Sequence, residues 1–428
     1  MPRTQPCFVR GSLHPLLESN RFSSFMQFIN HLSKKNLSNK VCLLRVDFNI
    51  EEGGSINKSP RFLNAVNTIK LLNKKGAKVV ILSHRGRPKK AISDKQQATR
   101  YSLKPFLGIL SKTLKKPVQF VKFSDKNLRE KIRNSKPESV FMLENLRFHP
   151  GEDKNDKSFA KKIAGLGDFY VNDAFAFSHR KTASMAAITN FLPSYAGPTL
   201  EKEIKKLSSV LTNHKKPLIV ILGGVKISTK LGLIKNFFKK AKPRSELRSA
   251  TGADYFLIGS AMADNFLVAQ GLPIGDSVYE KEMAGFTKKL LKSTHSTGSG
   301  QAKIILPVDF IISNRKILDI GKKTEKQFAD IIKKAKTIIW NGPVGQFEIP
   351  KFASGTNAII KAILKNKNAK VIIGGGETVQ AISKYQPWIS KNKNIFVSTG
   401  GGAMLEYLSA KKLPGIEMLK RKSSRILR

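Results

Sequence analysis

Short runs of apolar residues recur along the whole chain, and most of them are rich in β-branched side chains. Runs of about four to eight such residues are typical of strands in a parallel sheet that is covered on both faces. The predicted strands are residues 41–49, 77–82, 117–121, 140–143 and 169–172 in the first half of the chain, and 218–222, 254–258, 303–306, 337–340, 369–373 and 395–397 in the second.

Segments with a helical spacing of apolar residues separate many of these strands. Helices are predicted over residues 61–72, 102–114 and 199–213, and another is expected to begin near Lys226, directly after a strand. Strands that alternate with helices predict an α/β fold with mainly parallel sheets. A length of 428 residues and a hydrophobic content of 40% are enough for two domains with cores of their own.

Composition narrows the class of protein. Cys7 and Cys42 are the only cysteines, so no disulfide framework is expected and a reducing cytoplasm fits best. No apolar run approaches the ~18 residues that a membrane span needs. Residues 1–40 hold six Lys and Arg against the single acid Glu18, which suits either an organelle transit peptide or an upstream helical extension.

The net charge is extreme, because 77 Lys and Arg face only 30 Asp and Glu to give +47. Such an excess can indicate a polyanionic partner. The lysines are spread along the whole chain, however, and the sequence has no zinc-finger spacing and no RNP-like aromatic motif. A generally solvated lysine surface is therefore the favoured interpretation, with a nucleic-acid groove as the alternative.

The predicted strands of the first half end in polar residues. Arg45, Asp47 and Asn49 alternate at the end of the first strand, and His84 follows the second. Because the carboxyl ends of parallel strands meet at one edge of a sheet, these groups are expected to converge. The cationic candidates are Arg45, Arg61, His84, Arg87, Arg147 and Arg180. Together they predict a pocket for a small, multiply anionic molecule, although a salt bridge would explain any single arginine equally well.

The segment PLIVILGGVKISTKLG, residues 217–232, joins a buried strand to the start of a helix. Gly223 and Gly224 allow a sharp turn and a close approach to a ligand, and the following helix would direct its free N–H groups to the same place. Lys226 and Lys230 are four residues apart and are expected on one helix face. The segment predicts an anion site, and the alternative is a solvated basic face after a structural turn.

Glycine-rich segments follow the later strands as well, at residues 340–343, 374–378 and 400–402. The chain has no GxxxxGK[ST] loop and no GxGxxG at a strand end. Phosphate groups would therefore be held by several separate loops and helix N-termini.

These motifs together resemble those of the phosphoglycerate kinase family. RVDFN, SHRGRP, ENLRFHPGE, VNDAF, HR, GGVKISTK, PVD, DIG, WNGPVGQFE, GGGET and STGGGA occur in the family's order and at its spacings, from about residue 40 to residue 419. The combination is specific, whereas a single glycine run is not.

The resemblance implies two three-layer, α/β/α, Rossmann-like domains with mainly parallel sheets, joined by a hinge helix. It divides the chain into an N-terminal extension of unknown role at 1–35, a phosphoglycerate-binding domain at 36–198 to which 413–428 return, the hinge helix at 199–213 and a nucleotide-binding domain at 214–412.

The implied function is reversible phosphoryl transfer between 1,3-bisphosphoglycerate and ADP, which gives 3-phosphoglycerate and ATP in glycolysis. The resemblance also implies Mg²⁺, closure about the hinge, a monomer in the cytoplasm and no membrane partner. A catalytically weak relative that binds nucleotides or nucleic acid is the alternative.

The resemblance implies a role for individual residues. Those implied to bind the phosphoglycerate are Arg45, Asp47, Asn49, Arg61, His84, Arg87, Arg147, His179 and Arg180. Those implied to bind the nucleotide are Gly223, Gly224, Lys226, Lys230, Asn341, Glu348, Gly375, Gly376, Glu377 and Thr378. Among all these, Arg61, Lys226 and Lys230 would be catalytic, and Glu377 would lie at the metal.

The chain departs from the family pattern at a few positions. Glu377 stands where the family has Asp, which moves the carboxylate outward by about 1.5 Å. Ser260 and Ala261 replace two glycines, which could crowd the adenine pocket, and Thr182 replaces a histidine. Residues 241–252 are expected to form an inserted basic loop of unknown role.

Overall fold

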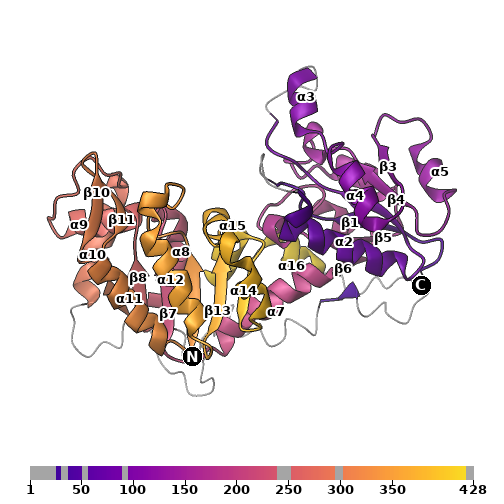
Figure 1. Cartoon of the computed structure of the whole chain (residues 1–428). Coiled ribbons are helices and arrows are strands. Elements are labelled where there is room, and N and C mark those ends of the chain that lie inside the picture. Colours follow the sequence, from indigo (N-terminus) through magenta and orange to yellow (C-terminus); the bar gives the residue numbers. More distant parts are fainter. Residues whose placement is uncertain are drawn as a thin grey trace, which may run out of the picture.

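Two parallel sheets form the framework of the protein, for which a computed structural model describes residues 26–29, 37–50, 56–88, 95–238, 252–294 and 302–420. Each sheet lies in its own lobe and carries helices on both faces (Figure 1). The fold is therefore of the predicted α/β class with two domains. Most of the N-terminal extension and nearly all of the 241–252 insertion fall outside the described residues.

The first sheet has the strand order β3-β4-β2-β1-β5-β6, with every neighbouring pair parallel. Its strands are β1 Val41–Arg45, β2 Lys78–Leu82, β3 Val118–Val121, β4 Val140–Leu143, β5 Phe169–Asn172 and β6 Ser194–Ala196. The accompanying helices are α2 Pro60–Asn73, α3 Lys95–Tyr101, α4 Phe106–Leu114, α5 Leu128–Arg133 and α6 Lys157–Ala164. Alternate residues of β1 and β2 pack into different apolar clusters on the two faces, which is why these strands are apolar throughout.

The second sheet has the order β14-β13-β12-β7-β8-β9 and is also parallel. Its strands are β7 Leu218–Leu222, β8 Tyr255–Ile258, β9 Lys303–Ile305, β12 Thr337–Asn341, β13 Lys370–Gly374 and β14 Ile395–Val397. The accompanying helices are α8 Leu231–Phe238, α9 Ala261–Ala269, α10 Ala284–Thr294, α11 Lys322–Lys334, α12 Ser354–Lys365, α13 Gly376–Ala381, α14 Gln386–Lys391 and α15 Gly401–Leu408.

Helix α7, Pro198–Thr212, connects the two lobes (Figure 1), and the last described helix, α16 Pro414–Lys420, contacts β6 of the first lobe. The apolar face of α7 belongs to a cluster that continues from the first sheet into the second. The Gly415 N–H donates to the Ser178 carbonyl, and the Asn172 side chain donates to the Gly415 carbonyl. The chain thus returns to the first lobe after completing the second.

Residues 26–29 also belong to the first lobe. Phe28 pairs in parallel with Ala196 at the edge of β6, where the Ala196 N–H donates to the Gln27 carbonyl over 2.9 Å. Met26, Phe28 and Ile29 are buried. The end of the predicted N-terminal extension therefore covers a strand edge that would otherwise be free.

Two predicted helices begin later than expected. The segment after β7 turns through Gly224, and its 3₁₀ turn η7 spans Ser228–Lys230 before α8 starts at Leu231, so Lys226 precedes the helix. The predicted helix over 102–114 starts only at Phe106, because Pro105 disfavours helical backbone in the residue before it.

Three short strands escaped prediction. β6 has only three residues, which is too short for a clear apolar pattern. The strands β10 Phe310–Ser313 and β11 Lys316–Ile320 form an antiparallel hairpin. Its turn residues Asn314 and Arg315 both have positive φ, at 48° and 58°, a conformation for which Asn-Gly rather than Asn-Arg is the usual sequence signal.

Candidate active site

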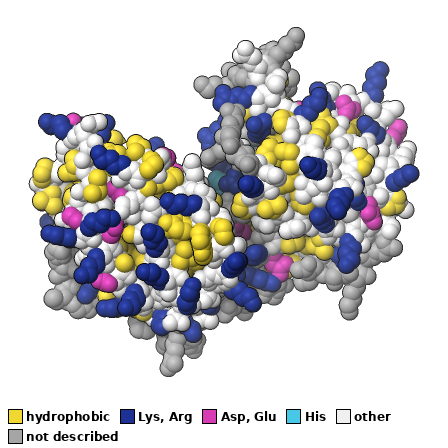
Figure 2. Space-filling view, viewed as in Figure 1, with side chains coloured by type: hydrophobic (Ala, Val, Ile, Leu, Met, Phe, Trp, Pro, Cys, Tyr) yellow, Lys and Arg dark blue, Asp and Glu magenta, His cyan; other side chains and the backbone are white. Residues whose placement is uncertain are grey.

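The candidate site has two halves, one at the carboxyl edge of each sheet. Figure 2 shows the surface hollowed between the two lobes, while Lys and Arg are scattered over both lobes on this face. The scattered charge agrees with the solvated lysine surface that the sequence favoured.

Arg61, in the first turn of α2, is held by the loop that follows β1. Its Nη1 lies 3.2 Å from Asp47 Oδ2 and donates to the Asn49 carbonyl over 2.7 Å. The Asn49 side chain accepts a hydrogen bond of 2.8 Å from the Gly86 N–H, which brings in the loop after β2. Three of the predicted residues therefore lie together at the sheet edge.

His84 and Arg45 form a buried pair beneath this group. Arg45 Nη2 lies 3.0 Å from His84 Nδ1, and the His84 ring lies against Phe177 with ring centres 4.1 Å apart. A guanidinium can only donate, so Nδ1 accepts and the His84 proton resides on Nε2. Burial, followed by the charges of Arg45, Arg147, Arg61 and Arg87, lowers the pKa of His84 well below its usual value. His84 is therefore a neutral hydrogen-bond donor at pH 7.

Arg45 does not reach the surface, in contrast to the predicted contact with substrate. Its side chain is fully buried, Nε donates to Ser184 Oγ over 3.0 Å, and Nη1 donates to the Val46 carbonyl. With every guanidinium nitrogen engaged, Arg45 fixes the tautomer and position of His84 instead of presenting a free cation.

Arg147 and Arg87 lie on the loops after β4 and β2. Arg147 Nη1 donates to the Gly86 carbonyl over 2.6 Å, and its Nε donates to Asp153 over 3.2 Å. Arg87 is exposed and acts on His84 through its charge. The loop at Gly86 thus joins Arg147 to the Asn49 and Arg61 group.

Arg180 is exposed at the same edge, whereas His179 faces the other lobe. A Cβ placed on Gly402, at the start of α15, would lie 3.8 Å from His179 Nε2. Burial, and next the charge of Arg180, lowers the pKa of His179. The structure therefore places His179 at the contact between the lobes.

In the second lobe, Gly223 packs against the backbone of the loop that contains Gly342 and Pro343. A Cβ at Gly223 would collide with the Pro343 carbonyl, and Gly342, at φ +97°, packs back against Gly223. The predicted close approach of Gly223 to a ligand is thus replaced by a close approach of two loops.

Gly224, at φ +80°, faces the side-chain ends of Lys230 and Glu377. A Cβ there would lie 3.4 Å from Lys230 Nζ and 3.5 Å from Glu377 Oε2, so these two side chains flank the same glycine. Burial lowers the pKa of Lys230, while the charges of Glu377 and Glu280 raise it.

Lys226 and Lys230 do not share a helix face, contrary to the prediction. Lys230 ends η7 and is buried, whereas Lys226 is exposed in the turn before it. Glu280, which the sequence analysis missed, fixes this turn by accepting from the Ser228 N–H over 2.9 Å and from its hydroxyl over 2.6 Å.

The remaining nucleotide-side candidates differ in exposure. Asn341 Nδ2 donates to the Gly374 carbonyl and Thr378 Oγ1 accepts from the Gly342 N–H, so both side chains tie loops together. Gly375 has φ +105° and leads into α13, where Gly376 and Glu377 are exposed. Glu348 is also exposed, and no contact within the described residues joins it to Glu377.

A polar chain that the sequence analysis missed connects the lobes. Arg61 Nε and Nη2 donate to the Thr399 carbonyl in the second lobe over 3.2 and 3.0 Å. The Glu203 carboxylate of α7 accepts from the Thr399 N–H over 2.6 Å, from the Thr399 hydroxyl and from the Ser398 hydroxyl. The sequence did contain one signal of this buried contact, because Glu203 interrupts the apolar stripe of α7 between Leu200 and Ile204.

We expect Glu203→Gln to change how stability depends on pH. Burial raises the pKa of Glu203 to about 7 from its ordinary 4.5, against the hydrogen bonds from Thr399 and Ser398. Between these values the folded protein holds a proton that the unfolded chain has lost, so the free energy of unfolding falls as pH rises through this window. Between pH 5 and pH 8 the variant should therefore gain about 2 kcal/mol relative to the wild type.

Denaturant unfolding of both proteins at these two pH values measures this gain. Glu201→Gln is the control, because that carboxylate pairs with Lys205 on the same helix. A stability difference between Glu203→Gln and wild type that is equal at both pH values would contradict the assignment.

Within the described residues, no three His, Cys, Asp or Glu side chains gather into a ready metal site. Mg²⁺ commonly binds through one or two carboxylates together with substrate phosphates. The exposed carboxylate of Glu377, near Lys230, fits that pattern. In the described part of the chain, no helix combines the length and apolar character needed to cross a bilayer.

Known proteins are similar to this chain over most of its length. The sequence profile of the family described as phosphoglycerate kinase matches residues 32–411. The chain is 41% identical over 408 residues to a phosphoglycerate kinase of Pseudothermotoga lettingae, covering 90% of this chain and 96% of the relative. It is 40% identical over 424 residues to a phosphoglycerate kinase of Orientia tsutsugamushi (strain Ikeda), and this match covers 92% of this chain and 98% of the relative.

Solved structures agree as well. The phosphoglycerate kinase of Coxiella burnetii superimposes with a TM-score of 0.74 at 34% identity, and that of Pyrococcus horikoshii OT3 with 0.75 at 31%. Each match covers 92% of this chain and 99% of the other.

Proposed function

The chain belongs to the phosphoglycerate kinase family, and from that premise we propose how its residues divide the work. The reaction is the glycolytic, reversible transfer of a phosphoryl group between 1,3-bisphosphoglycerate and ADP, which gives 3-phosphoglycerate and ATP. The comparisons do not favour the alternative of a weak relative that only binds nucleotides or nucleic acid.

The phosphoglycerate is assigned to the first lobe. Its carboxylate and phosphate would be bound by the arginines around Gly86 and β1, with neutral His84 donating from Nε2. The residues assigned to it are Asp47, Asn49, Arg61, His84, Arg87, Arg147 and Arg180, while Arg45 positions His84.

The nucleotide is assigned to the second lobe. Lys230 lies buried beside Gly224 and Glu377 and would hold a phosphate of the bound nucleotide, while Glu348 would bind its ribose. Glu377 would hold Mg²⁺ together with the nucleotide phosphates, and the ion would supply charge neutralisation there. Gly375, Gly376, Asn341 and Thr378 shape the loops around it.

The observation that carries this division is the double contact of Arg61. It pairs with Asp47 in the first lobe and donates to Thr399 in the second, which supports the proposal that Arg61 is a catalytic cation between the two substrates. The attacking oxygen of ADP or of 3-phosphoglycerate is already ionised at neutral pH, so the transfer needs no general base. Alignment and cations from Arg61 and Lys226 stabilise the transferring charge.

Water must be kept from the acyl phosphate, and closure of the lobes about α7 would exclude it. We also propose that the protein is a monomer in the cytoplasm and that its many Lys and Arg form a solvated surface in preference to a nucleic-acid groove. The presence of only two cysteines supports a reducing cytoplasm. The scattered Lys and Arg on the face shown in Figure 2 support a solvated surface.

Glu377 stands where the family has Asp, and this difference allows an experiment that tests the proposed function. If the longer carboxylate reaches the metal through water or a shifted loop, the wild type should need more free Mg²⁺ than Glu377→Asp and should accept Mn²⁺ comparatively well. A titration of both metals at fixed nucleotide measures the half-saturation values and the Mn²⁺/Mg²⁺ activity ratio.

Equal values in the two proteins would mean that the loop after Gly376 absorbs the extra methylene. If neither protein showed metal-dependent phosphoryl transfer, the assigned function would be wrong and a binding protein would be favoured.

A further inference from the structure

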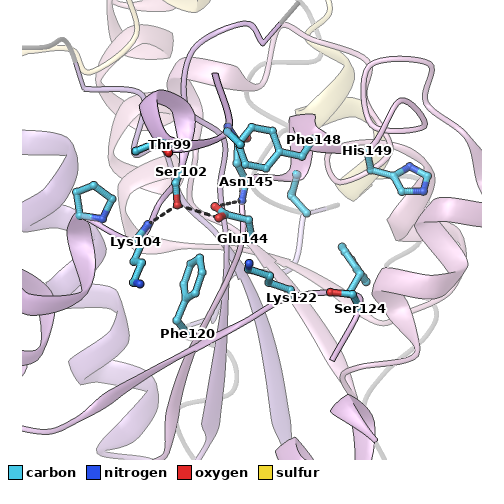
Figure 3. A pocket seen from close by; sticks show the side chains of 14 residues that line it. Thr99, Ser102, Lys104, Phe120, Lys122, Ser124, Glu144, Asn145, Phe148 and His149 are labelled. Atoms are coloured by element: carbon cyan, nitrogen blue, oxygen red, sulfur yellow. Dashed lines mark hydrogen bonds between the residues drawn. The ribbon is translucent and has the colours of Figure 1, made fainter. Parts of the chain in front are cut away.

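A second cavity, of ≈ 840 Å³, lies in the first lobe at the carboxyl ends of β3 and β4 and beside α3 (Figure 3). Sites for small organic molecules in proteins occupy roughly 300–1,000 Å³ and are mostly apolar with a few polar groups. This cavity lies beside the site described above, which uses the ends of β1, β2, β4 and β5, but none of the residues assigned to phosphoglycerate lines it. It is therefore a candidate for a separate ligand.

The walls of the cavity are aromatic. Phe120, Phe123 and Phe148 line it together with Pro105 and Leu146. Phe123 packs against the Phe159 ring with centres 5.3 Å apart, and 38% of its surface is still exposed. A flat apolar body would bury these rings.

The polar groups of the cavity leave positive charge available. The Glu144 carboxylate already accepts from Ser102 Oγ over 2.8 Å and from the N–H groups of Leu103 and Asn145 over 2.9 and 2.8 Å. Lys104 and Lys122 also line the cavity, and both are exposed. Within the described residues neither ammonium donates a hydrogen bond or forms an ion pair.

We propose that this cavity binds a small anion with a flat apolar body, of the class of aromatic carboxylates and sulfonates. The phenylalanine rings would enclose the body, and the two lysines would pair with the anionic group.

The cavity is joined to the Arg147 segment by short contacts. Its wall contains Asn145, Leu146 and Phe148, while Arg147 between them points to Gly86. The buried Asn145 side chain donates to the carbonyls of Arg85 and Tyr101, each over 2.8 Å, and accepts from the Arg147 N–H over 3.1 Å. An occupant would therefore touch the back of the segment that presents Arg147.

A consequence follows that rests on the proposed function. A bound anion would add negative charge behind Arg147 and Arg87, which would weaken the attraction of these cations for phosphoglycerate. We expect the KM for 3-phosphoglycerate to rise at least about twofold and the KM for ATP to stay unchanged.

The binding test uses the full chain saturated with Mg-ADP, titrated with anilinonaphthalene sulfonate and followed by fluorescence. We expect one saturable site, and at least about tenfold weaker binding in the double variant Lys104→Glu, Lys122→Glu. The control is Lys112→Glu, Lys126→Glu, which makes the same charge change at exposed positions of the same lobe outside the cavity. Phenylnaphthylamine, the uncharged parent of the probe, should not distinguish these variants.

Equal affinity in the two double variants would overturn the proposal. So would undiminished binding to Ala98→Trp, a variant that fills the cavity without changing charge. A bound probe that left both KM values unchanged would overturn the coupling. Absence of turnover in the wild type would contradict the proposed function without affecting the fluorescence result.

Discussion

Replacing Lys226 with alanine is expected to lower turnover by at least about 100-fold, with little change in nucleotide affinity. Lys230 is buried beside Gly224, whereas Lys226 is exposed in the preceding turn and can follow the group in flight. Its charge therefore acts mainly in the transition state, where loss of one donor costs about 3 kcal/mol.

Steady-state kinetics and calorimetric titration with Mg-ADP measure the two quantities separately. Lys235→Ala is the control, since Lys235 is exposed on α8 and its ammonium lies over the Phe286 ring instead of at Gly224. Near-normal turnover in Lys226→Ala, or an equal loss in Lys235→Ala, would contradict the assigned role.

The second large effect concerns Arg61 and Arg180. Alanine at either position should raise the KM for 3-phosphoglycerate at least about tenfold while the KM for ATP changes less than about twofold, because both residues belong to the first lobe. Arg61→Ala should also lower kcat, since it removes the contact with the Thr399 carbonyl as well as the pair with Asp47.

Separate saturation curves for the two substrates distinguish these effects. Arg133→Ala serves as the control, because Arg133 pairs with Asp168, which binds the amino end of β1 on the opposite edge of the sheet. Similar increases in both KM values would show that the site is not divided between the lobes.

The sequence predicted the central strands and the edge at which the site lies. Runs such as residues 218–222 are apolar because both faces are buried, and strand polarity alone brings the residues after β1, β2, β4 and β5 to one edge. The hairpin β10–β11 and the three-residue β6 carried no such signal.

The sequence could not show which of two residues of the same type is buried in the protein and which faces the site. Arg45 ends β1 and Arg61 lies in the first turn of α2, and both were predicted to bind substrate, yet the first is enclosed by Ser184, Val46 and His84 and the second reaches Thr399. Gly223 and Gly224 are adjacent, yet one packs against Pro343 and the other faces Lys230. These differences arise from contacts between segments far apart in the chain.

The contact between the lobes also could not be predicted from the sequence pattern. Glu203 is one of several charged residues in α7, and only the structure shows its carboxylate buried against Ser398 and Thr399. The network depends on a helix and a loop that are 195 or more residues apart.

The most direct test of the account is the initial rate of ADP formation from Mg-ATP, with and without 3-phosphoglycerate. Phosphoryl transfer across the two lobes predicts a rate that saturates in both substrates and falls to background when 3-phosphoglycerate is omitted, because closure keeps water from acting as the acceptor. ADP formation that does not depend on 3-phosphoglycerate, or its absence when both substrates are saturating, would contradict the account.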